Sequence, residues 1–155
     1  MRNFAEIVVS EALSGLGLAD AALDAEGDLA FEMSGVQVLL SHREAPLDAL
    51  WITVGVGPVP QGDFGSDPDA LYWMLDAAGE HWLRNGLTLG LDSPGKQVCC
   101  RLVLPTGLVT ADGLAEAITG AIEVAVDLQE TLASRRFEAR AAAGEDVPTS
   151  HPGFV

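Results

Sequence analysis

The chain has 155 residues and carries 23 Asp and Glu against 8 Lys and Arg, a formal net charge of −15, yet 48% of its residues are hydrophobic. This apolar content is too high for an acidic disordered chain, so we expect a folded protein, and its length suits one domain. The negative field repels phosphate backbones and anionic lipid headgroups. It therefore argues against nucleic acid and membrane as partners and favours a basic protein partner.

We expect no signal peptide in the first residues, because Glu6 stands where such a peptide would continue with apolar residues. No stretch elsewhere reaches the roughly 18 apolar residues of a transmembrane helix, and we expect a cytoplasmic protein. The two cysteines, Cys99 and Cys100, are neighbours. Adjacent side chains of a strand point to opposite faces, so we expect reduced thiols and no disulfide between them.

Hydrophobic spacing in the first part of the chain predicts one helix followed by three strands. The helix has its apolar residues on one stripe, whereas the strands alternate between apolar and polar positions. Ser34 and Gly35 break the first strand from the second, which predicts a hairpin, and Gly57 and Pro58 end the third strand. These elements span residues 4–16, 28–33, 36–40 and 50–56.

The second part predicts a helix, two strands and a long final helix. Asp67 and Pro68 have the form of a helix start, with a capping acid before a proline at the first helical position. The apolar surface of this helix is wider than contact with one sheet face requires. The four elements span residues 68–84, 87–91, 97–104 and 110–132.

The expected fold is therefore α+β, in the order α-β-β-β-α-β-β-α. Short connections within each group of strands favour hairpins, which give a twisted antiparallel sheet with helices packed on one face. We assign residues 1–134 to one domain and residues 135–155 to a frayed helix end and a flexible C-terminal tail.

Residues typical of reactive sites are present, but their spacing groups none of them. His42, His81 and His151 lack the spacing of a zinc site, and no serine lies in a Gly-x-Ser-x-Gly turn. Gly55 and Gly57 precede a proline, whereas a dinucleotide loop needs a helix-opening glycine. We therefore predict no catalytic residue, no metal site and no cofactor, and expect that the protein is not an enzyme.

The three tryptophans are most simply read as core or interface residues. Trp51 lies on a predicted strand, and Trp82 on the apolar stripe of the second helix. Trp73 is one position off that stripe, so it could be exposed in a monomer, where an exposed Trp would mark a protein contact.

The order of elements resembles that of the class I type III secretion chaperones, the Tir-chaperone-like group of small acidic cytoplasmic proteins. The similarity is strongest from Ile52 to Leu132. It rests on Val54-Gly55-Val56-Gly57-x-Val59-Pro60, on a helix opened by Asp67-Pro68 and ending near Asn85-Gly86, and on Cys100-Arg101-Leu102-Val103-Leu104-Pro105. The final helix and the amphipathic first helix match in position.

The resemblance implies a homodimer, whose contact is formed by the second helix and the strand after it. This agrees with the wide apolar surface of that helix. The implied interface residues are Leu71, Tyr72, Met74, Leu75, Ala78, Trp82, Leu87 and Leu89.

The resemblance also implies an ATP-independent chaperone that binds the extended, non-globular N-terminal segment of a secreted effector. The implied effector-binding residues are Phe4, Ile7, Val8, Leu16, Phe31, Met33, Val36, Val38 and Leu40. One alternative is a regulatory or adaptor protein of the same fold that binds another partner through the same surface. A small-molecule enzyme is the least favoured reading.

Overall fold

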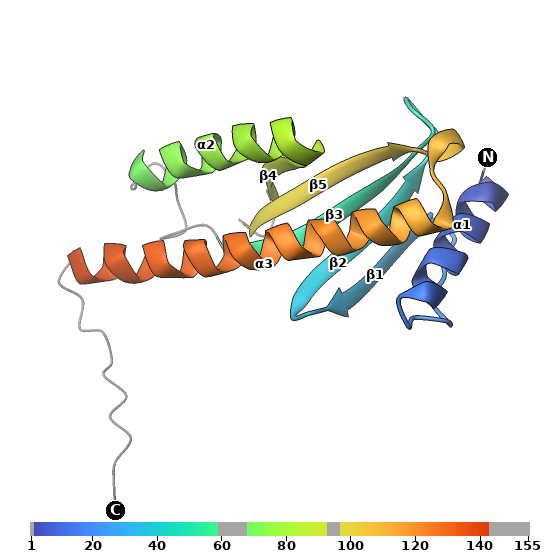
Figure 1. Cartoon of the computed structure of the whole chain (residues 1–155), viewed down its shortest axis with the longest axis horizontal. Coiled ribbons are helices and arrows are strands. Elements are labelled where there is room, and N and C mark those ends of the chain that lie inside the picture. Colours follow the sequence, from blue (N-terminus) through green and yellow to red (C-terminus); the bar gives the residue numbers. More distant parts are fainter. Residues whose placement is uncertain (1, 59–67, 93–96, 143–155) are drawn as a thin grey trace, which may run out of the picture.

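The computed structural model describes residues 2–58, 68–92 and 97–142, with the side chains of 68–71 and 135–142 left undescribed. Its elements follow the expected order (Figure 1). They are α1 (Arg2–Gly15), β1 (Asp28–Met33), β2 (Val36–Arg43), β3 (Ala49–Pro58), α2 (Pro68–Asn85), β4 (Thr88–Asp92), β5 (Gln97–Pro105), the short 3-10 helix η3 (Thr106–Leu108) and α3 (Ala111–Ala142).

The five strands form one antiparallel sheet in the order β1-β2-β3-β5-β4. The β1–β2 hairpin turns at Ser34 and Gly35, which both have positive φ, 53° and 76°. Two positive φ angles in a two-residue loop match the twist of the flanking strands, so this turn favours the hairpin. The register of β3 and β5 shifts between Gly55 and Gly57, where a β-bulge bends the strand.

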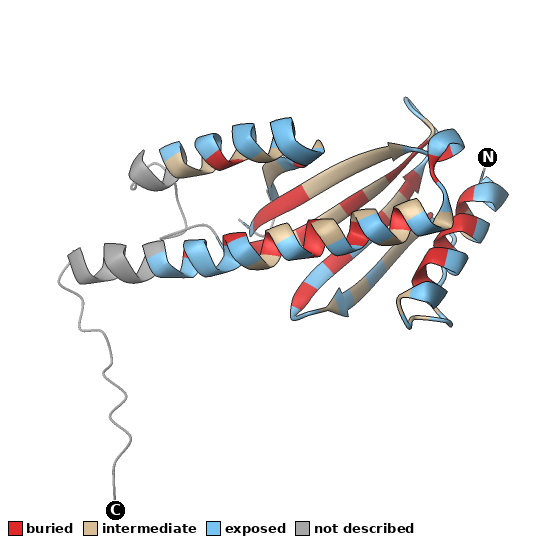
Figure 2. Ribbon diagram, viewed as in Figure 1, coloured by how far each residue is buried: buried red, intermediate tan, exposed pale blue. Residues whose placement is uncertain are grey.

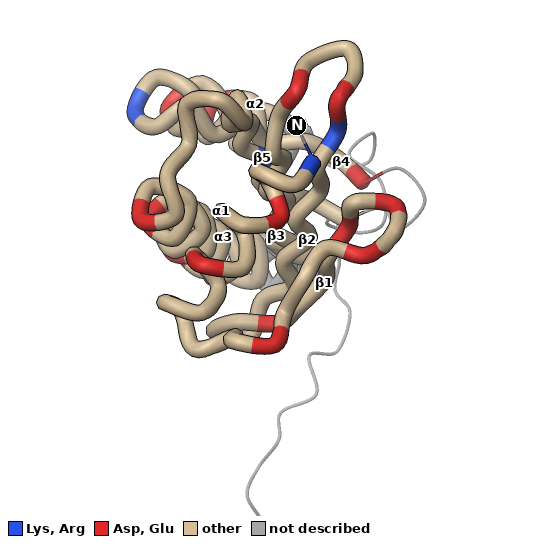
Figure 3. Tube along the Cα trace, turned by 90° about the vertical axis from the view of Figure 1, so that its right-hand side faces the viewer, with Lys and Arg blue, Asp and Glu red and all other residues tan. Residues whose placement is uncertain are grey.

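The core lies between one face of the sheet and the helices. Alternate residues of β2 and β3 point to this face and are buried, among them Val38, Leu40, Ile52 and Val54. Helices α1 and α3 pack on this face and against each other, and Figure 3 shows the helices on the same side of the strands. The long stripe of α3 from Leu114 to Leu132 supplies most of the helical side of the core (Figure 2).

Helix ends coincide with residues that satisfy free backbone groups. After α1, Gly17 takes a φ of 85° and the Leu18 N–H donates to the Leu13 carbonyl, 2.8 Å. At the start of α3, the Thr110 hydroxyl accepts the Gly113 N–H, 3.1 Å. These local signals explain why the sequence predicts most element boundaries closely.

The largest departure from the sequence prediction concerns α3, which continues to Ala142 and does not end near Leu132. Residues 135–142 of this helix therefore lie in the segment that we assigned to a frayed helix end and a flexible tail. The tail prediction for residues 143–155 falls outside the described residues. Strands β2 and β3 are also longer than expected, because their pairing continues to Arg43 and Ala49.

Gly27 offers a sharp test of the loop before β1. Its φ is 85°, and a Cβ at this position would lie 3.0 Å from the His42 carbonyl oxygen. We expect Gly27→Ala to cost more than the roughly 1–2 kcal/mol of a left-handed alanine, and so to lower Tm by at least about 2–4 °C. Gly17→Ala is the matched control, because Gly17 has the same φ with nothing within 4 Å. Equal Tm losses in the two variants, measured by calorimetry, would contradict a steric role for Gly27.

Candidate protein-binding surfaces

The first candidate surface lies on α1. Ala5, Val8 and Val9 bury one side of this helix, whereas Phe4 and Ile7 stay 43% and 56% exposed on the other. Large apolar side chains on an otherwise acidic surface favour contact with another molecule. We call Phe4 and Ile7 the α1 patch.

Strand β1 carries other residues that the sequence analysis assigned to effector binding. It lies at one edge of the sheet, and among the described strands it pairs with β2 alone. Its outer N–H and C=O groups can therefore pair with an extended peptide. Phe31 and Met33 of β1, and Leu16 after α1, are half-buried against the core and keep part of their surface open.

Four of the nine residues predicted to bind an effector are core residues in this structure. Val8, Val36, Val38 and Leu40 are each 5% exposed or less. Val8 points from α1 into the core, and the three β2 residues point from the sheet into the same core, so none of them offers a surface to a partner. This corrects their placement on an exposed patch, and the surface is reduced to Phe4, Ile7, Leu16, Phe31 and Met33.

The second candidate surface is the outer side of α2. Tyr72, Leu75, Trp82 and Leu83 are 70%, 57%, 59% and 85% exposed. Sequence reasoning missed Leu83, although it lies next to Trp82 on the same helix. We call these four residues the α2 face.

The remaining residues of the predicted dimer interface differ in burial. Met74, Ala78 and Leu89 are half-buried, the Leu71 side chain lies outside the description, and Leu87 is 2% exposed within the single chain. The burial of Leu87 corrects its place in the predicted interface, since a core side chain adds little contact area. Trp73 is half-buried and packs against the core, so the exposure suggested for it is wrong.

The open face of the sheet carries a groove that the sequence did not reveal. No described helix covers the side chains that alternate with the core residues, such as Leu39, Thr53 and Arg101. A groove of about 680 Å³ runs over this face near Gly55 and Cys99. The sequence led us to expect the helices on one face of the sheet, so the open second face agrees with that expectation, whereas the groove over it was not predicted.

The polar groups of the chain do not assemble a reactive site in the described residues. Burial raises the pKa of Cys99, and it raises the pKa of Cys100 to about 12, so both thiols stay protonated at neutral pH. His42 is buried and shares a 2.8 Å hydrogen bond with Asp48, which ties the end of β2 to the turn before β3. Within the described ranges, no group of three His, Cys, Asp or Glu side chains could hold a metal ion.

Comparison with models of protein families identifies the family to which the chain belongs. The model of the Tir chaperone protein (CesT) family matches residues 9–129, which include the whole sheet, the second half of α1 and most of α3. The chain belongs to the Tir chaperone protein family. This confirms the resemblance seen in the sequence, and membership of a chaperone family agrees with the expectation of a non-enzymatic protein.

Solved structures show the same fold at low sequence identity. The chain is similar to a chain of the HopA1-SchA chaperone-effector complex, with a TM-score of 0.69, 16% identity, and coverage of 83% of this chain and 95% of that one. A chain of the ExsC-ExsE complex matches with a TM-score of 0.67 and 20% identity, and the match covers 82% of this chain and 92% of that one. The structure of the Yersinia pestis type III secretion chaperone SycH in complex with a stable fragment of YscM2 matches with a TM-score of 0.60 and 18% identity. This match covers 80% of this chain and 98% of that one.

These matches confirm the α+β fold and the element order expected for a Tir chaperone. The comparison with curated proteins finds no match. Among the described residues, no helix combines the length and the apolar character needed to cross a membrane.

Proposed function

We propose that this Tir chaperone family member binds the extended N-terminal segment of a type III secretion effector and keeps it soluble and ready for export. The observation that carries the proposal is the α1 patch, where Phe4 and Ile7 stay exposed on a helix whose opposite side is core. The similar solved chains support it, because they come from a chaperone-effector complex and from a type III secretion chaperone with a bound fragment.

The physical basis is a combination of apolar contact and strand pairing. An extended segment gains main-chain hydrogen bonds along the free edge of β1 and side-chain contacts at Phe4, Ile7, Phe31 and Met33. Ordering such a segment costs free energy, so a large contact area must offset the cost. The chaperone then acts by mass action, without nucleotide, in the cytoplasm where effectors are made.

We further propose that the chain is a homodimer joined through the α2 face. Tyr72, Leu75, Trp82 and Leu83 expose more apolar surface than a solvated helix needs. A two-fold contact would place the same four residues of each copy against each other. The formal charge of −15 per chain favours an interface built from apolar residues, since charged rims of the same sign repel.

The test of the function uses the native host with and without the chaperone gene. Proteins that copurify with the chaperone are identified, and each is expressed with and without its N-terminal segment. The proposal expects a secreted partner that needs this segment for binding, and whose soluble amount and secretion fall when the chaperone is deleted.

The adaptor alternative predicts a different outcome. A partner bound through a folded domain, with secretion unchanged in the deletion strain, would overturn the chaperone proposal. It would favour a regulatory protein with the same fold.

A further inference from the structure

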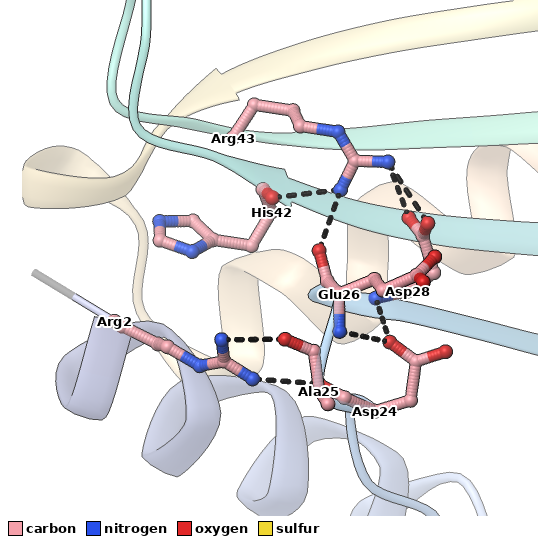
Figure 4. A network of polar contacts seen from close by, with 7 residues as sticks. All are labelled: Arg2, Asp24, Ala25, Glu26, Asp28, His42 and Arg43. Atoms are coloured by element: carbon pink, nitrogen blue, oxygen red, sulfur yellow. Dashed lines mark hydrogen bonds and ion pairs between the residues drawn. The ribbon is translucent and has the colours of Figure 1, made fainter.

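We propose that Arg2 is a positioning residue, which fixes the first turn of α1 so that the α1 patch meets its client in one orientation. The inference rests on the proposed function of the patch, but its structural half concerns the free chaperone alone. Figure 4 shows the contacts that carry it.

Arg2 joins α1 to a loop far away in the sequence. Its Nη1 and Nη2 donate to two consecutive carbonyl oxygens, those of Ala25 at 2.8 Å and Asp24 at 2.6 Å. The Nε of Arg2 donates to Glu6 Oε1, 2.8 Å, within the same helix. The planar guanidinium thus directs two donors to the loop, which sets the angle of the helix relative to the loop, while its third donor stays within the helix.

The loop that Arg2 contacts is itself held together by hydrogen bonds. Oδ1 of Asp24 accepts the N–H groups of Glu26 at 2.8 Å and Asp28 at 2.9 Å. The N–H bond from Asp28 is the main cause that holds the pKa of Asp24 below its ordinary value, so the carboxylate keeps its charge and both contacts at neutral pH. Arg2 therefore donates hydrogen bonds to a turn that has hydrogen bonds of its own.

A second arginine anchors the same turn to the sheet. Arg43, at the end of β2, donates through Nη2 to both carboxylate oxygens of Asp28, 2.8 and 2.9 Å. Its Nη1 donates to the carbonyls of Glu26 at 3.2 Å and His42 at 2.9 Å. The contacts form a continuous path from β2 through the loop to the first turn of α1 (Figure 4).

The first turn of α1 is an unfavourable position for the positive charge of Arg2. A cation in the first turn of a helix opposes the helix dipole, and α1 has no acidic residue in that turn to offset it. The chain also has only 8 Lys and Arg in total. One of them stands at the unfavourable end of α1 and is held by backbone carbonyls, which indicates that the contact to the loop is what Arg2 provides.

The first turn of α1 gains little from apolar packing among the described residues, so its polar contacts matter for its position. Ala5 is its only buried residue among those described, and an alanine contributes few packing contacts, whereas Val8, Val9 and Leu13 anchor the later turns. Phe4 lies in the weakly packed turn and Ile7 just after it. Without Arg2, the turn that carries Phe4 would fray, and a client would have to order it on binding.

The test compares Arg2→Ala, Arg2→Lys and Glu6→Gln in the full chain. Hydrogen exchange reports the protection of the first turn of α1 in the free protein, calorimetry reports Tm, and titration reports the Kd of the effector N-terminal segment that the copurification experiment above identifies. For Arg2→Ala we expect about tenfold less protection and about tenfold weaker binding, with Tm within about 2 °C of the parent chain.

The other two variants separate the loop contact from the ion pair. Glu6→Gln keeps both carbonyl contacts and should match the parent chain, and Arg2→Lys, with fewer directed donors, should fall between the parent and Arg2→Ala. Unchanged protection and Kd in Arg2→Ala would overturn the inference. So would an effect of Glu6→Gln as large as that of Arg2→Ala. Failure of the parent chain to bind the segment would instead overturn the proposed function. In that case hydrogen exchange in the free protein would still decide whether Arg2 fixes the first turn of α1.

Discussion

The combined change Leu75→Glu and Trp82→Glu is expected to convert the proposed dimer into folded monomers. Both side chains are more than half exposed on α2, so the single chain does not need them for its core. Each apolar side chain buried at an interface contributes roughly 1.5–3 kcal/mol, and an unpaired carboxylate in its place adds a desolvation cost. A loss of about 4 kcal/mol or more raises the dimer Kd by roughly 1,000-fold.

Light scattering coupled to size exclusion at micromolar concentration measures this change. The parent chain should give twice the chain mass of 16.2 kDa, and the double variant should give that mass itself, with an unchanged circular dichroism spectrum. Leu108→Glu is the matched control, because Leu108 is 84% exposed on η3 and not on α2. A monomeric parent chain at this concentration would refute the α2 face as a dimer contact.

The second large effect is expected from Phe4→Asp in the α1 patch. Phe4 is 43% exposed, so its replacement should leave Tm within a few degrees, whereas a client segment would lose an aromatic anchor and meet a carboxylate. We expect a loss of at least about 2 kcal/mol, which weakens binding by roughly 30-fold. Titration calorimetry with the effector N-terminal segment measures it.

Two further variants make the result specific. Phe4→Ala removes the side chain without adding charge and should show a smaller loss of affinity, and Leu108→Asp adds the same charge to an exposed leucine outside the patch. If Phe4→Asp unfolds the protein, Phe4 belongs to the core. If it binds as the parent chain does, the patch is misplaced.

Most of the fold could be predicted because its signals are local. The turn at Ser34 and Gly35, the start of α2 at Pro68 and the alternation of β1 and β2 each act within a few residues. The end of α3 could not be found in the same way. Apolar spacing stops at Leu132, but residues 133–142 are mostly Ala and Arg, which favour a helix by intrinsic propensity.

The candidate surfaces were harder to predict, because exposure depends on which element covers each residue. Ile7 and Val8 are neighbours of similar character, yet packing leaves one 56% exposed and buries the other. On α2, the contact of Ala77 with the core sets the rotation of the helix, which turns Trp82 outward and Trp73 inward. The Arg2 contacts join residues 22 and 23 positions apart, a distance that no sequence spacing reveals.

The two protonated, enclosed thiols at Cys99 and Cys100 have a practical consequence. Alkylating reagents need an accessible thiolate, so the parent chain should remain unlabelled by maleimide under native conditions. A cysteine introduced as Leu108→Cys, at an 84% exposed position outside both candidate surfaces, would then be the single attachment point for a fluorophore. The parent sequence thus already serves as the low-background scaffold that spectroscopic work on chaperone loading and release requires.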